Sequence, residues 1–156
     1  MAKRDEEVLK SLTDKFKDKI IDPKNPRDRR LFFKIAKEDN FEIVKFLKEK
    51  MGFVHCATIT GCDSKTHFEI MYHLFDNQNT ICTVKAQVPK EDPFLESITP
   101  LIAGANLYER ELFDILGVTT KNHPNLKRLV LPEDYPVDAH PMLKDWDPST
   151  IENVIK

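Results

Sequence analysis

The sequence has little of what most active sites are built from. Its four glycines are too far apart to form a phosphate-binding loop: Gly52, Gly61, Gly104 and Gly117. The three cysteines and five histidines include no Cys-x-x-Cys and no His-x-x-x-His spacing, which metal sites commonly use. We therefore expect no catalytic residue, no cofactor-binding residue and no metal ligand in this chain.

Signals for a membrane span, for secretion and for nucleic-acid binding are also missing. No apolar run approaches the roughly 18 residues that cross a bilayer, and the first seven residues carry charges where a signal peptide needs an apolar core. An odd number of cysteines without such a signal indicates reduced thiols in a cytosolic compartment. The chain has 156 residues, 40% of them hydrophobic and 32% charged, with a net charge of -2. This composition predicts a soluble globular protein.

Alternating apolar residues predict a sheet with one face on a core. Strands are expected at about 31–36, 53–60, 66–75 and 79–88, and the turn at 76–79 should join the last two as an antiparallel hairpin. The expected core row is Phe68, Ile70, Tyr72, Leu74, Cys82, Val84, Ala86 and Val88. The fold class is therefore α+β: a mostly antiparallel sheet of about four strands, with helices packed on one face.

Helical spacing of apolar residues is found at 5–20, at about 40–51 and at 105–116, where Gly117 is a suitable end. Residues 21–30 hold two prolines and many charges, and are expected to be a linker. Five of the ten prolines lie in the last 40 residues, where they prevent regular structure. We divide the chain into an N-terminal helix and linker (1–30), an α+β domain (31–117) and an extended arm that docks on a partner (118–156).

The 105–116 helix places Glu109 at the edge of its apolar arc. A carboxylate there should be partly desolvated, so it needs a cation or a hydrogen-bond donor. The nearest candidates in sequence are His123, Lys127 and Arg128. Arg110 and Asp114 are four residues apart and are expected to be able to pair. At 100° per residue, Glu109, Glu111 and Asp114 point in three directions, so they do not form an acid–base pair. An ion pair that ties the arm to the helix is favoured over direct contact with a redox partner.

Trp146, the only tryptophan, lies in the arm beside Lys144 and Asp145. A tryptophan flanked by charges is a common interface anchor. The basic residues of the arm are not clustered and have no aromatic residues between them, so nucleic acid is not the expected partner. The arm is therefore predicted to bind protein.

The same stretch resembles the 30 kDa subunit family of respiratory complex I. This family includes the corresponding subunit of membrane-bound, energy-converting nickel–iron hydrogenases. The resemblance is strong over about 97–146, looser over 31–96, and absent from the first 20 residues. The positions that carry it are Glu109, Arg110, Glu111, Asp114, Gly117, His123, Pro124, Leu126, Arg128, Pro141, Lys144 and Asp145.

Two features of the arm distinguish this chain within the family it resembles. Leu143 stands where the family often has arginine, and Trp146 stands where it often has phenylalanine. Any salt bridge made by that arginine is therefore not expected here. The segment 131–136, Leu-Pro-Glu-Asp-Tyr-Pro, looks closer to the hydrogenase branch than to the mitochondrial one.

The resemblance implies a non-catalytic, cofactor-free accessory subunit in the hydrophilic arm of a membrane-bound oxidoreductase that couples electron transfer to ion translocation. Its partners would be a hydrogenase-like large subunit, an iron–sulfur small subunit and, indirectly, the membrane arm, on the cytoplasmic side of the cell membrane. Iron–sulfur clusters, and NiFe in the hydrogenase branch, would lie in those partners. An energy-converting hydrogenase is favoured. The alternatives are the 30 kDa subunit of a quinone-reducing NADH or other complex I-type dehydrogenase, a free-standing protein-binding module, and a stand-alone enzyme.

Overall fold

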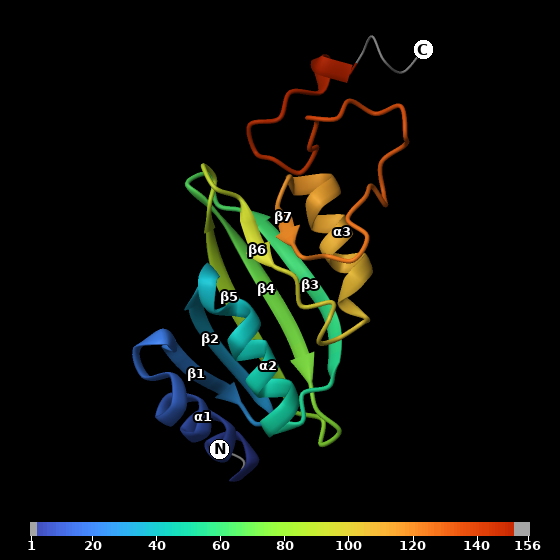
Figure 1. The fold of residues 1–156 in the computed structure, drawn as a ribbon. Coiled ribbons are helices and arrows are strands. Elements are labelled where there is room, and N and C mark those ends of the chain that lie inside the picture. The colour runs from blue at the N-terminus through green and yellow to red at the C-terminus, as the bar shows by residue number, and fades with distance from the viewer. Residues whose placement is uncertain (1–2, 152–156) are drawn as a thin grey trace.

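The computed structural model describes residues 3–151, and its centre is a five-stranded sheet (Figure 1). The strands are β1 (Ile21–Arg27), β2 (Arg30–Ala36), β3 (His55–Asp63), β4 (His67–Phe75) and β5 (Ile81–Pro89). Their order across the sheet is β1-β2-β5-β4-β3. All neighbours run antiparallel except β2 and β5, which run parallel. The expected α+β class and the β4–β5 hairpin are confirmed, and the sheet has one more strand than the four expected.

Three α-helices cover one face of the sheet. They are α1 (Lys3–Phe16), α2 (Asn40–Met51) and α3 (Ala105–Leu116), with short 3-10 turns at Lys17–Lys19, Lys37–Asp39 and Pro148–Ile151. The eight alternating residues expected to form the core row on β4 and β5 are all buried, none more than 4% exposed. Burial of these apolar side chains between sheet and helices is the main source of stability. The opposite face of β4 and β5 is not covered by any of the three helices.

The segment expected to be a linker forms a strand instead. Residues 21–27 pair with β2 as β1, although Pro23 and Pro26 lie within them. β1 lies at the edge of the five-stranded sheet, and β2 is its one neighbour there. A proline N that faces away from β2 therefore removes no hydrogen bond from the sheet. The pairing shifts register on either side of Lys24, which accommodates both prolines.

Helix α3 lies against β3, and glycine makes the close approach possible. A Cβ atom at Gly61 on β3 would clash with the side chains of Leu112 and Leu116 of α3. The helix ends at Gly117 as expected, because Gly117 adopts a left-handed conformation with φ of 73°. A Cβ atom there would also lie 2.8 Å from the ring of His140, so the same glycine lets the arm return to the end of the helix.

The predicted arm begins inside the folded part of the chain. β7 (Thr119–Lys121) pairs in parallel with β6 (Phe94–Glu96) to form a second, two-stranded sheet. After β7, residues 122–147 form turns and bends without a helix or strand, and in Figure 1 they loop around the far end of α3, opposite α1. None of the helices within residues 3–151 is both long and apolar enough to cross a membrane.

Candidate functional site

Six of the signature residues meet where the arm packs on α3. Glu109, Arg110 and Asp114 lie on the helix and bind groups in the arm or in the loop before the helix. Of the residues in the arm, His123 and Arg128 face this side of the helix. Two buried carboxylates organise the junction, and they are held in different ways.

Glu109 is 1% exposed and is surrounded by donors from the loop before α3. Its carboxylate accepts hydrogen bonds from the Ser97 hydroxyl at 2.6 Å, the Thr99 hydroxyl at 2.9 Å and the backbone N–H of Ile98 at 2.7 Å. Burial raises the pKa of Glu109 above its ordinary value, although these three donors and His123 act in the opposite direction. The expected desolvation of Glu109 is present, and sequence reasoning missed the two hydroxyls.

Of the three partners expected for Glu109, only His123 lies beside it. His123 Nε2 is 3.7 Å from the Glu109 carboxylate and 3.2 Å from the carbonyl of Asn106. The other ring nitrogen, Nδ1, accepts the backbone N–H of Asn125 at 3.0 Å, so the neutral ring carries its proton on Nε2. His123 is thus oriented from both sides and joins the start of the arm to the helix.

Asp114 fixes the next part of the arm. One carboxylate oxygen accepts the backbone N–H groups of Leu129, Val130 and Leu131, at 3.0, 2.8 and 2.9 Å. The side chain of Arg128 lies 4.0 Å from the other oxygen. Burial alone would raise the pKa of Asp114, but the three N–H groups and Arg128 hold it below its ordinary value. Asp114 is therefore an ionised anchor for three consecutive residues.

The expected pair between Arg110 and Asp114 is replaced by contacts to the arm. Arg110 donates to the carbonyls of Lys127 and Arg128, at 3.0 and 2.7 Å. Arg128 donates to the carbonyl of Pro136 at 2.7 Å. One oxygen of the Asp114 carboxylate instead accepts three backbone N–H groups of the arm, and the other has no hydrogen bond among the described residues. Hydrogen bonds therefore run in both directions, since Arg110 of the helix donates to the arm and the backbone of the arm donates to Asp114 of the helix.

A third buried carboxylate, Asp63 at the end of β3, holds the later part of the arm. It accepts the Lys90 ammonium at 2.8 Å, the backbone N–H of Lys144 at 3.0 Å and the backbone N–H of Lys65 at 2.7 Å. Burial alone would raise its pKa, but these donors lower it to about 2. Sequence reasoning missed Asp63, because its partners Lys90 and Lys144 are far from it along the chain.

The pKa of Asp63 predicts a stability change with a defined sign. The pKa of Asp63 is lowered from 3.8 to about 2, so the ionised carboxylate stabilises the fold. This stabilisation is complete above about pH 3.8 and is lost as the pH falls toward 2. We expect Asp63→Asn to weaken that pH dependence and to lower the free energy of unfolding at neutral pH by about 1–3 kcal/mol. Urea unfolding over a pH series measures both effects. Glu91→Gln also removes one negative charge, but at an exposed position. It should leave the free energy of unfolding unchanged across the pH series.

The remaining signature residues are placed less tightly. Pro124 and Pro141 lie in turns, and Asp145 is exposed. Glu111 borders a shallow hollow between α3 and β3, and no hydrogen bond or ion pair joins it to the rest of residues 3–151. The indole N–H of Trp146 is buried without a hydrogen-bond partner among the described residues. The structure therefore gathers Glu109, Arg110, Asp114, Gly117, His123 and Arg128 at the junction of helix and arm. The other site residues are not part of this junction, and they are Glu111, Pro124, Pro141, Lys144, Asp145 and Trp146.

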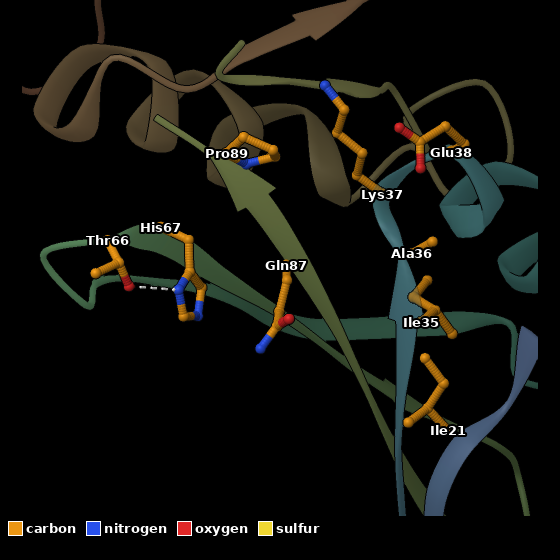
Figure 2. A pocket seen from close by; sticks show the side chains of 9 residues that line it. All are labelled: Ile21, Ile35, Ala36, Lys37, Glu38, Thr66, His67, Gln87 and Pro89. Carbon is orange, nitrogen blue, oxygen red and sulfur yellow. Dashed lines mark hydrogen bonds between the residues drawn. The ribbon is translucent and has the colours of Figure 1, made fainter. Parts of the chain in front are cut away.

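A pocket of about 500 Å³ lies away from this junction, at the ends of β2 and β5. Figure 2 shows that Lys37 and Glu38 lie apart from His67 and Gln87, so the polar groups do not converge on one point. Lys37 instead donates to the carboxylate of Asp92 at 2.7 Å. Across residues 3–151, no three His, Cys, Asp or Glu side chains are grouped so as to hold a metal ion.

Proteins with similar sequences include subunits of a dehydrogenase and of an oxidoreductase. The family described as "Respiratory-chain NADH dehydrogenase, 30 Kd subunit" matches residues 33–152. A subunit of the F(420)H(2) dehydrogenase of Methanosarcina mazei is 32% identical, covering 90% of each chain. A subunit of the NADH-quinone oxidoreductase of Geobacter metallireducens is 31% identical, covering 94% of this chain and 91% of the relative.

Two solved structures have a similar fold. A chain of the membrane-bound sulfane sulfur reductase, described as an archaeal respiratory membrane complex, aligns with a TM-score of 0.82 at 23% identity, over 95% of this chain and 89% of that one. A trypsin-resistant fragment of Nqo5 aligns with a TM-score of 0.66 at 32% identity, over 79% of this chain and 99% of the fragment. The fold of this chain is thus shared with a chain of an archaeal respiratory membrane complex and with the Nqo5 fragment.

Proposed function

The chain belongs to the family of the 30 kDa subunit of the respiratory-chain NADH dehydrogenase, and we propose that it is the cofactor-free accessory subunit of a membrane-bound oxidoreductase related to complex I. In this proposal the chain contributes architecture and the neighbouring subunits carry the iron–sulfur clusters and the reaction. The large, hydrogenase-like subunit is its main partner, with an iron–sulfur small subunit beside it. The assembly holds the chain at the cytoplasmic side of the cell membrane.

The docking proposal rests on one observation: the arm is anchored to the helix and yet exposes large apolar side chains. The exposed side chains are Leu129, Val130, Val137 and Met142, and Val137 is 80% exposed. Asp114, Arg110 and Arg128 hold the arm in one conformation through its backbone, which leaves these side chains free to contact a partner. A preordered surface of this kind binds with little loss of conformational entropy.

For the type of assembly, we favour an energy-converting nickel–iron hydrogenase, because residues 131–136 resemble that branch. The runner-up is a complex I-type dehydrogenase, which the names of the F(420)H(2) dehydrogenase and NADH-quinone oxidoreductase relatives support. Affinity purification from native cells in mild detergent tests both. We expect a large subunit, an iron–sulfur subunit and antiporter-like membrane proteins to co-purify. Metal-binding cysteines in that large subunit would favour hydrogenase, and recovery of the chain alone would contradict the proposal.

Arg128→Ala should weaken this assembly. The change removes the hydrogen bond to Pro136 and the positive charge near Asp114, so the loop between them loses its internal support. Loss of about 1–2 kcal/mol of preorganisation lowers the recovery of intact complex by about tenfold. Arg27→Ala is the matched control, because Arg27 is exposed on β1 at the edge of the sheet. Equal yields of active complex from both variants would count against docking through the arm.

A further inference from the structure

Three lysines from distant parts of the chain line one pocket beside the arm. The pocket has a volume of about 320 Å³ and is bordered by Lys65, Lys90, Lys144 and Asp145. Asp63 brings the lysines together, since it binds the backbone N–H groups of Lys65 and Lys144 and the ammonium of Lys90. We call this site the lysine pocket. Its position is set by a buried carboxylate, so it is a built feature of the fold.

The lysine pocket has unbalanced positive charge. Lys90 is engaged by Asp63 at 2.8 Å, so these two charges offset each other. The ammonium groups of Lys65 and Lys144 are exposed, and neither has a hydrogen bond or ion pair within residues 3–151. Among the described residues that border the pocket, Asp145 is the one with an acidic side chain. Like charges held together repel, and an anionic group from a partner relieves that repulsion.

An apolar hollow adjoins the lysine pocket. It has a volume of about 300 Å³ and shares Lys90 and Asp145 with that pocket. Most of its remaining lining is apolar and comes from Phe68, Pro93, Leu116 and Leu143, with Gly117 and the ring of His140 beside them. The two recesses together therefore offer a place for an apolar side chain directly beside a place for an anion. A broad, flat basic surface, as anionic membranes attract, would not combine these two features.

We propose that the lysine pocket and its apolar hollow bind a segment of a neighbouring subunit in which a carboxylate side chain lies next to an aliphatic or aromatic one. The carboxylate lies between Lys65 and Lys144, and the apolar side chain enters the hollow beside Leu143. Burial of the apolar group supplies affinity, and the two lysines select the acidic neighbour. This inference rests on the proposed function, because it takes the partner from the same assembly.

Zero-length cross-linking of the purified complex tests the contact directly. A carbodiimide joins an amine to a carboxylate only when the two touch, and mass spectrometry then identifies the joined peptides. We expect Lys65 or Lys144 to be linked to an aspartate or glutamate of another subunit, with an apolar residue within two positions of it. The link between Lys19 and Asp39, whose charged groups are 2.7 Å apart and reachable from solvent, is the internal positive control.

Amine acetylation of the complex and of the free chain gives an independent readout. Lys65 and Lys144 should react at least about fivefold more slowly in the complex, whereas the exposed helix residues Lys45 and Lys50 should react alike in both. Equal reactivity of Lys65 in both states, with the complex intact, would overturn the inference and leave the proposed function standing. Protection that disappears on lipid removal while the subunits stay together would assign the lysines to lipid, and would also overturn it. Absence of any partner subunit would instead refute the proposed function.

Discussion

Replacing Asp114 with alanine should release the arm from helix α3. The change leaves the N–H groups of Leu129, Val130 and Leu131 without their acceptor and leaves Arg128 without its nearest carboxylate. Loss of a buried, charged hydrogen-bond centre costs about 3–5 kcal/mol. Because the bonds hold only the arm, we expect local opening of residues 127–136 and a smaller effect on the sheet.

Trypsin measures this opening at the start of the segment, where it can cut after Lys127 and after Arg128. The peptide bond after Arg128 leads directly into the three anchored residues, so the wild-type chain should be cut there slowly. An opening free energy lower by about 3 kcal/mol raises the cleavage rate about a hundredfold, since each 1.4 kcal/mol is a factor of ten. Glu111→Ala removes the same charge from the same helix and should leave the rate unchanged, because no described residue pairs with Glu111. Unchanged cleavage in Asp114→Ala would show that the carboxylate is not the anchor.

Asp114→Asn separates charge from shape in this anchor. The amide keeps one oxygen in place for the arm N–H groups but carries no charge, and its nitrogen is a donor. We therefore expect cleavage between that of wild type and Asp114→Ala. The lowered pKa of Asp114 has the same origin, because the ionised form is the one that three N–H groups and Arg128 stabilise against burial.

Local sequence patterns predicted the parts of the fold that depend on near neighbours. The alternation of Phe68 to Leu74 and of Cys82 to Val88 identified two adjacent strands and their buried face, because a strand repeats every two residues. The apolar arc of 105–116 and the glycine at 117 likewise identified α3 and its end. The desolvation of Glu109 followed from its position on that arc. Each of these features is determined within about a dozen residues.

The parts that the sequence did not reveal depend on distant contacts. Pro23 and Pro26 indicated a linker, and only the position of β1 at the sheet edge makes a strand possible there. The Ser97 and Thr99 donors to Glu109 lie in a loop whose path has no periodic signal. Asp63 in turn gathers groups from both ends of the hairpin and from the arm. Such sites require the tertiary structure, because no local pattern specifies which donors a buried carboxylate receives.

Replacing Glu109 with alanine should have the largest effect on the stability of the whole chain. The change leaves two hydroxyl donors and one backbone N–H without their acceptor in a site that is 1% exposed, and it also opens a cavity. We expect the free energy of unfolding to fall by about 3–5 kcal/mol. Because Ser97 and Thr99 precede α3 and His123 follows β7, the loss should also loosen the arm and lower the yield of assembled complex.

Glu109→Gln provides the matched test, because the amide keeps the size of the side chain and one acceptor oxygen. Burial raises the pKa of Glu109 above the ordinary value of 4.5 that it has in the unfolded chain. Ionisation of the wild-type residue therefore destabilises the fold as the pH rises from about 4.5 through the raised pKa. At low pH the protonated acid and the amide are nearly equivalent, and the stability of Glu109→Gln relative to wild type should increase with pH. Urea unfolding of both proteins from about pH 4 to about pH 8 measures the difference, and the contributions of Asp63 and Asp114 cancel in it. A constant difference across this range would mean that the donors from Ser97, Ile98 and Thr99 fully offset the burial of the charge.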